Sequence, residues 1–117
     1  MLCHLGDAEA MVLRTRPRVK PLPQRKRAVL KLLSLWSPLR WPHGWSSNPM
    51  LNPKVDGTRP SVFDTDLQRA IDGLRNIAAA GPGTLEPAHG FFGTMSVADW
   101  QRWAYKHTDH HLRQFGL

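Results

Sequence analysis

The sequence predicts an all-α protein, and three observations support that fold class. Apolar residues recur at helical spacing in the stretches 1–13, 62–80 and 97–115, and a leucine-rich stretch covers 24–36. No stretch alternates apolar and polar residues as a half-buried strand does. The ten prolines lie outside the helical stretches, where they interrupt the backbone hydrogen bonding. A chain of 117 residues is long enough for one domain, spanning 1–117, with an adequate core.

The first half of the chain is expected to hold two helices separated by a proline-rich segment. The stripe Met1, Leu5, Ala8, Met11 and Val12 predicts a helix over 1–13, and His4 falls inside that stripe. Residues 14–23 contain three prolines and are expected to be an extended connection. A second helix is expected over 24–36, and its leucines on most sides call for partners around much of its circumference.

The second half is expected to hold a long loop and two further helices. Residues 37–60 contain five prolines, Trp41 and Trp45, and a loop of this length is usually functional. The third helix is expected over 62–80, ended by a Gly-Pro-Gly turn. Ser96 and Asp99 have the spacing of a capping box, which places the start of the fourth helix at Val97.

Charge and cysteine content narrow the class of protein. The net charge is +7, and eight cations lie between Arg14 and Lys31 with no acid among them. Such a run contacts nucleic acid or an anionic membrane, or it forms a solvated face. The sequence contains no membrane-length apolar stretch and no secretory signal. The lone Cys3 cannot form an internal disulfide, which fits a reducing cytoplasm, so a cytoplasmic location is expected.

Two histidines near the end of the fourth helix form a candidate metal pair. His107 and His111 are one helical turn apart, so one ion can reach both imidazoles. A helical wheel places both at the centre of the inward stripe and His110 at its edge. His4, on the stripe of another helix, is a candidate third ligand, and three ligands would leave an open position. The alternative is a set of core histidines satisfied by hydrogen bonds.

The remaining candidates around this site have both functional and structural interpretations. Asp7, one turn from His4, is expected either to face solvent or to orient a ligand. His110, Arg113 and Gln114 are candidates for ligand orientation or for contact with an anionic substrate, although a basic residue there also complements the helix dipole. Cys3 is a candidate fourth ligand, although an inert buried role is favoured. His43 and His89 lie in loops that can approach the site, but a surface position is favoured for both. The tryptophans are candidates for pocket walls, with a core role favoured: Trp41, Trp45, Trp100 and Trp103.

The segment from His89 to Leu117 resembles the C-terminal part of a domain-of-unknown-function branch of the DinB/YfiT-like superfamily. The resemblance lies in Phe92-Gly93, Ser96, Trp100 and the closing motif HxxHHLRQFG. The opening MLCHLGDA is similar to the second helix of that branch, and the proline-rich middle is similar more weakly. The resemblance implies an up-down four-helix bundle in which His4, His107 and His111 bind a divalent metal. Relatives in the wider superfamily include metal-dependent transferases that use low-molecular-weight thiols, so the resemblance implies this activity as one expectation.

One departure from that family concerns the start of the chain. The family places a whole helix before the segment that opens this sequence, so a bundle lacking its first helix is expected. Such a bundle exposes an apolar groove, which favours a homodimer.

Two functions are therefore predicted. The first is a zinc- or nickel-binding protein acting on a small molecule, as a thiol-dependent transferase or a hydrolase. The alternative is a non-catalytic protein whose basic segment 14–31 contacts nucleic acid or an anionic membrane. That run lacks the interleaved aromatic residues of nucleic-acid recognition motifs.

Overall fold

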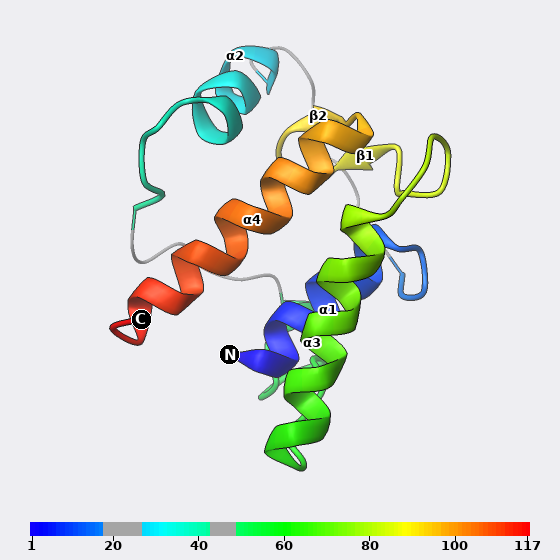
Figure 1. Cartoon of the computed structure of the whole chain (residues 1–117), viewed down its shortest axis with the longest axis vertical. Coiled ribbons are helices and arrows are strands. Elements are labelled where there is room, and N and C mark those ends of the chain that lie inside the picture. Colours follow the sequence, from blue (N-terminus) through cyan, green and yellow to red (C-terminus); the bar gives the residue numbers. More distant parts are fainter. Residues whose placement is uncertain (18–26, 43–48) are drawn as a thin grey trace.

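The computed structural model describes residues 1–17, 27–42 and 49–117, and three long helices form its framework (Figure 1). These are α1 (Leu2–Val12), α3 (Phe63–Ala78) and α4 (Val97–Gln114), and each packs against the other two. Shorter elements complete the fold: α2 (Arg27–Lys31), the π-helical turn η1 (Leu32–Trp36), the 3-10 turn η2 (Pro49–Leu51), and the antiparallel strands β1 (Ala88–His89) and β2 (Gly93–Thr94). The predicted all-α class is confirmed, and the small hairpin is an addition to it.

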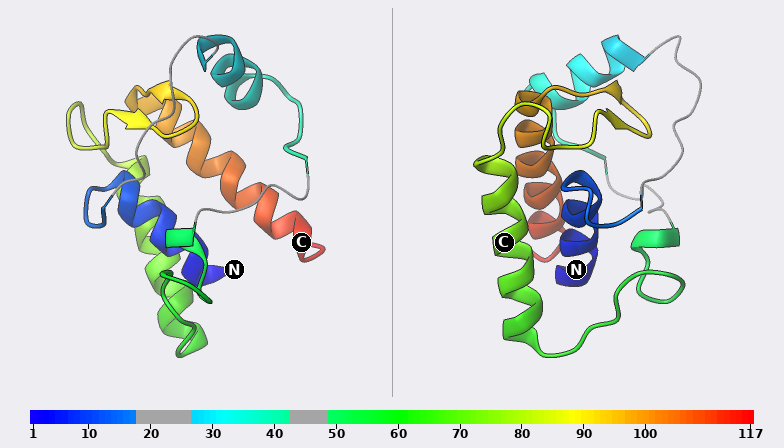
Figure 2. Two further views of the ribbon diagram at one scale, coloured as in Figure 1. Left: turned by 180° about the vertical axis from the view of Figure 1, so that it is seen from behind. Right: turned by 90° about the vertical axis from the view of Figure 1, so that its right-hand side faces the viewer.

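The directions of the three long helices can be followed in Figure 2. Cys3 contacts Asp66 near the start of both α1 and α3, and Glu9 lies against Gly73 further along both. The two helices therefore run parallel. The physical reason is that the connection between them returns to the end of the molecule where α1 begins. α4 runs antiparallel to α3, because Gln101 Nε2 at its start donates to the Ala78 carbonyl at the end of α3 (3.0 Å).

The contact between α1 and α3 depends on a close approach at Gly73. A Cβ atom at this position would overlap the Glu9 carboxylate, so any larger residue would push the helices apart. Glu9 is 2% exposed, and among the described residues neither of its carboxylate oxygens has a hydrogen-bond partner. Burial raises the pKa of Glu9 to about 8, against the opposing charge of Arg69. Glu9 is therefore protonated at neutral pH in the folded protein.

The second helix is expected to have packing partners around much of its circumference, but the structure covers only one side of α2 and η1. Leu35 is fully buried and belongs to the core, which includes Trp100, Trp103 and Ile77. The opposite side of α2 and η1 is exposed, with between 48% and 66% of each of these residues accessible: Val29, Leu32, Leu33 and Trp36. The predicted start of this helix, residues 24–26, lies outside the described residues, as do His43 and Trp45.

Asp99 joins η1 to the start of α4. The Ser96 hydroxyl accepts from the Asp99 amide (3.1 Å) and the Asp99 carboxylate accepts from the Ser96 amide (3.0 Å), which confirms the predicted capping box. The same carboxylate accepts from Lys31 Nζ (2.8 Å) and from Trp36 Nε1 (2.9 Å). Burial opposes ionisation of Asp99, but these donors hold its pKa at about 2. These bonds fix the direction of α4, whose far end reaches the start of α1.

Among the described residues, no helix is both long enough and apolar enough to cross a lipid bilayer.

Candidate metal centre

Three histidines meet where the first turn of α1 faces the last two turns of α4. His107 Nε2 lies 3.2 Å from His4 Nε2 and 3.2 Å from His111 Nε2. The three ligand nitrogens all lie within 4.8 Å of one another. The structure therefore brings together the three residues that the spacing and the helical wheel selected.

Hydrogen bonds on the far side of two rings determine which nitrogens face the centre of the group. His4 Nδ1 lies 3.1 Å from the Leu51 carbonyl, which can only accept, so His4 carries its proton on Nδ1. His111 Nδ1 lies 2.9 Å from Gln114 Oε1, and the same assignment follows. In the neutral tautomers, both Nε2 atoms then present bare lone pairs toward His107. A single proton on His107 Nε2 cannot fully satisfy two such acceptors, whereas a cation can.

The spacing of the nitrogens fits a bound metal ion. Zinc binds imidazole nitrogen at about 2.0–2.1 Å, so two nitrogens at a tetrahedral angle lie roughly 3.3 Å apart. The two separations that involve His107, both 3.2 Å, are close to this spacing, and all three nitrogens lie within 4.8 Å of one another. All three histidines are half-buried, so the group is accessible from solvent. Three protein ligands at an accessible position are typical of reactive rather than structural zinc sites.

The surroundings keep the imidazoles neutral, as metal ligation requires. Burial, followed by the charge of His111 and His4, lowers the pKa of His107 well below its usual value. Burial and the neighbouring His4 lower the pKa of His111 to about 4. Burial also lowers the pKa of His4, against the Leu51 hydrogen bond. All three residues are therefore uncharged at neutral pH.

Aromatic packing holds the His107 ring in place. The Trp103 ring stacks on it with centroids 4.6 Å apart and planes at 22°. Trp41, from the proline-rich loop, lies 6.4 Å from the His107 centroid and 6.1 Å from that of His110. Trp103 is therefore a core residue and Trp41 a wall of this region, so each of the two predicted roles for tryptophan is represented.

Gln114 links His111, one of the three candidate ligands, to His110. The Gln114 amide accepts from His111 through Oε1 and donates to His110 Nε2 (3.1 Å). Of the two roles weighed for Gln114, the structure shows the orientation of a ligand. His110 is 7% exposed, not at the edge of the buried face as the wheel predicts, because Trp41 packs on that side of α4.

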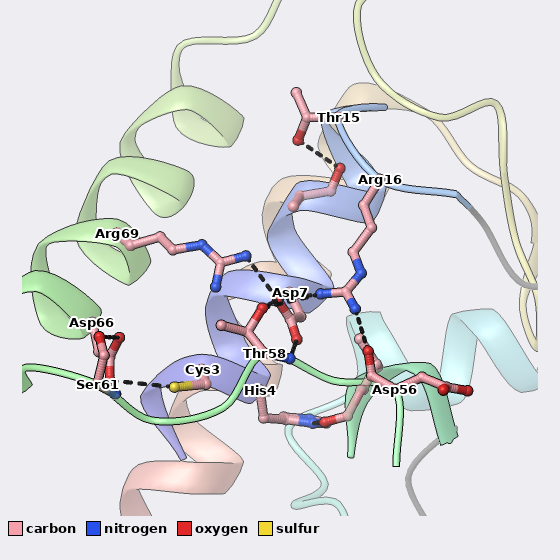
Figure 3. Close-up of polar contacts among 12 residues, drawn as sticks. Cys3, His4, Asp7, Thr15, Arg16, Asp56, Thr58, Ser61, Asp66 and Arg69 are labelled. Atoms are coloured by element: carbon pink, nitrogen blue, oxygen red, sulfur yellow. Dashed lines mark hydrogen bonds and ion pairs between the residues drawn. The ribbon is translucent and has the colours of Figure 1, made fainter. Parts of the chain in front are cut away.

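Asp7 neither faces solvent nor touches His4, so both interpretations from the sequence are wrong. It is fully buried, and Figure 3 shows its carboxylate between the guanidinium groups of Arg16 and Arg69. Thr58 donates to it twice, from its amide (2.7 Å) and its hydroxyl (2.6 Å). These donors lower the pKa of Asp7 in spite of its burial. Asp7 thus ties α1 to α3 and to residue 58 instead of serving the histidines.

Two other sequence candidates are also placed away from the ligand nitrogens. Cys3 Sγ donates to Asp66 (3.3 Å), and burial followed by this contact raises the pKa of the thiol. His89 was expected on the surface, but its ring packs between Phe92 and Trp100, and its Nδ1 accepts the amides of residues 91 and 92. The turn of the small hairpin causes this, because it folds the ring back over the start of α4. Burial lowers the pKa of His89 to about 4.

The described part of the basic segment is largely engaged within the molecule. Arg14 pairs with Glu86 (3.6 Å), Lys31 pairs with Asp99, and Arg16 pairs with Asp7. Arg27 is 8% exposed. The other cations of the run lie outside the described residues. Among the described residues, this segment therefore forms internal contacts rather than an open basic surface.

One functional group could not be identified from the sequence. The Leu51 carbonyl, which belongs to the 37–60 loop, orients His4. Because every residue has a backbone carbonyl, the residue type at this position gives no sign of the contact. The only available signal is the length of the 37–60 loop, which indicates a functional segment without naming an atom.

No protein-family model matches the chain, and the searches of curated proteins and of solved structures find no similar protein.

Proposed function

We propose that this protein binds one divalent metal ion, zinc or nickel, through the Nε2 atoms of His4, His107 and His111. The observation that carries the proposal is the meeting of three nitrogens, with His107 Nε2 3.2 Å from each of the other two, which direct their lone pairs inward. Hydrogen-bonded core histidines, the alternative, would place a donor against each acceptor. Here Leu51 and Gln114 take the protons of His4 and His111 away from the meeting point.

We further propose that the protein is a DinB-like, thiol-dependent transferase or a related hydrolase of the cytoplasm, acting on a small molecule. A bound ion of this kind supplies a Lewis acid that lowers the pKa of a coordinated thiol or water. The other residues of the site position the three imidazoles. Leu51 and Gln114 hold two of the rings in the tautomer that directs Nε2 inward, and Trp103 stacks on the third. Asp7, already bound to two arginines, is not available as a general base.

Elemental analysis tests metal binding. Protein produced with zinc, nickel and manganese supplied is expected to carry about one ion per chain, and His107→Ala and His111→Ala are expected to carry none. Tyr105→Ala, at an exposed position on the same helix, is the control and should keep the ion. Absence of stoichiometric metal from the unmodified protein under all three conditions would refute the site.

The thiol step needs a separate measurement. Cobalt-loaded protein titrated with a low-molecular-weight thiol should develop thiolate-to-cobalt charge-transfer absorption. If cobalt binds but no such band appears with any thiol, the metal site stands and the transferase proposal fails. Hydrolysis then remains as the chemistry to assay.

A further inference from the structure

A pocket of about 300 Å³ lies between residues 37–41 and a different face of α4 from the histidines. Its α4 wall is formed by residues that lie about 100–160° around the helix from His107. Four cationic side chains line it, together with a single carboxylate, that of Asp109: Arg40, Arg102, Lys106 and Arg113. Among the described residues that form this lining, the formal charge is therefore +3.

Two of these cations are fixed in place by the protein itself. Lys106 Nζ donates to the carbonyls of residues 34, 37 and 39 at 2.9, 2.6 and 3.0 Å. Arg113 is paired with Asp109, with its Nε and one terminal nitrogen 2.9 and 2.7 Å from the carboxylate. Most of their hydrogen-bond donors are thus used, and their positions are fixed. Burial lowers the pKa of Lys106, but its three carbonyl acceptors match the three protons of an ammonium group.

The other two cations retain donors that no described residue uses. Arg102 donates through Nε to the Leu35 carbonyl (3.0 Å), and its guanidinium carbon lies 5.6 Å from the centre of the Tyr105 ring. Its terminal nitrogens have no acceptor in the part of the chain that the structure describes. Arg40 makes no hydrogen bond or ion pair with the described residues and is exposed at the mouth of the pocket. The pocket therefore presents two guanidinium groups, one of them anchored, in a positive field.

We propose that this pocket binds a small organic anion through a phosphate or carboxylate group. Guanidinium groups hold such oxyanions with paired, charge-assisted hydrogen bonds, and the surrounding charge favours an anion over neutral molecules. The volume is at the lower end of the range for small-molecule sites. Trp41 and Tyr105 supply flat apolar walls for the rest of the ligand. The site is independent of the metal centre and does not require it to be occupied.

Titration of the purified protein followed by NMR tests the proposal, with inorganic phosphate and acetate as probes at constant ionic strength. Shift changes are expected to saturate and to cluster at residues 37–41 and 102–113. The relative affinity for the two probes distinguishes a phosphate site from a carboxylate site. The titration is repeated on His107→Ala, so that an anion bound at the histidines is recognised and excluded.

Charge-neutral variants separate a specific pocket from general attraction to a basic protein. Arg40→Gln and Arg102→Gln are each expected to weaken binding about tenfold, because each removes charged donors. Arg59→Gln removes the same charge from an exposed position outside the pocket and should leave affinity unchanged. Equal weakening by all three variants, or shifts spread over the whole surface, would overturn the proposal. Saturating binding that survives both pocket variants would overturn it as well.

Discussion

The two ends of α4 use buried polar groups in opposite ways. At its start, the Asp99 carboxylate accepts from Ser96, Lys31 and Trp36, so the charged group meets matching donors. At its end, His107 faces the nitrogens of His4 and His111, and acceptors meet acceptors. The first arrangement is complete within the protein and contributes to stability. A cation would complete the second arrangement, and this geometry is the basis of the proposed metal site.

Buried polar groups without partners cost free energy, so a protein keeps such a group where something outside the chain completes it or where the group becomes neutral. The three histidines are candidates for the first case, because a bound cation would complete them. Glu9 illustrates the second, because its pKa rises until the carboxyl is protonated. Asp7, two residues earlier on α1, has the opposite environment and the opposite pKa shift. Four predictions test this distinction between completed and incomplete groups.

The largest effect is expected from His107→Ala, which removes the nitrogen shared by both short contacts. Stoichiometric metal binding should be lost. In the unmodified protein, zinc at 100 times its dissociation constant should stabilise the fold by about 2.7 kcal/mol, and in the variant this stabilisation should vanish. Thermal denaturation with and without zinc measures both. An equal response of the two proteins would contradict the metal site.

Glu9→Gln tests the unpartnered carboxyl group. The pKa of Glu9 is raised from 4.5 to about 8, so the folded state holds an extra proton between these values. The contribution of Glu9 to the free energy of unfolding is therefore greatest below about pH 4.5. It falls by a few kcal/mol as the pH rises toward 8. The variant should lack this slope and exceed the unmodified protein at pH 9. Urea denaturation from pH 5 to 9 measures it, with Glu86→Gln as a control that retains the slope.

Asp99→Ala tests the completed end of α4 and should destabilise the fold by about 2–3 kcal/mol. The pKa of Asp99 is lowered to about 2 from 3.8, so its contribution is full above pH 3.8 and is lost as pH falls through 2. The unmodified protein should therefore lose about 2 kcal/mol more than the variant between pH 4 and 2. Acid denaturation curves of the two proteins decide the matter. Parallel curves would show that Asp99 is not the group responsible.

Gln114→Ala should have a subtler effect on the incomplete end. It removes the acceptor that fixes the His111 tautomer, so metal affinity should fall about 10- to 100-fold while one ion still binds at saturation. Competition with a chelator measures the affinity. Gln101→Ala is the matched control, since its amide bonds to Ala78 at the other end of α4. A change of the same size in both variants would mean that helix stability, not ligand orientation, is responsible.

Much of the secondary structure and part of the site could be predicted from the sequence. The helices begin and end within a few residues of their predicted bounds, because apolar periodicity and the Ser96–Asp99 capping box are local signals. The pairing of His107 with His111 is equally local, since residues four positions apart on a helix lie on the same face. The burial of Asp7, His89 and His110 could not be predicted. Each depends on which distant segment packs against it, and one-dimensional patterns do not contain that information.

By itself, then, the sequence determined the helices, the capping box and the histidine pair, all of which follow from interactions within a few residues. Only the tertiary structure decided that α1 runs parallel to α3, and that His4 therefore meets α4 at its end. It also decided that the Leu51 carbonyl turns His4 inward and that residues 37–41 close a cationic pocket on α4. The physical reason is the same in each case. These contacts join residues separated by tens of positions, and the chain between them must fold before they exist.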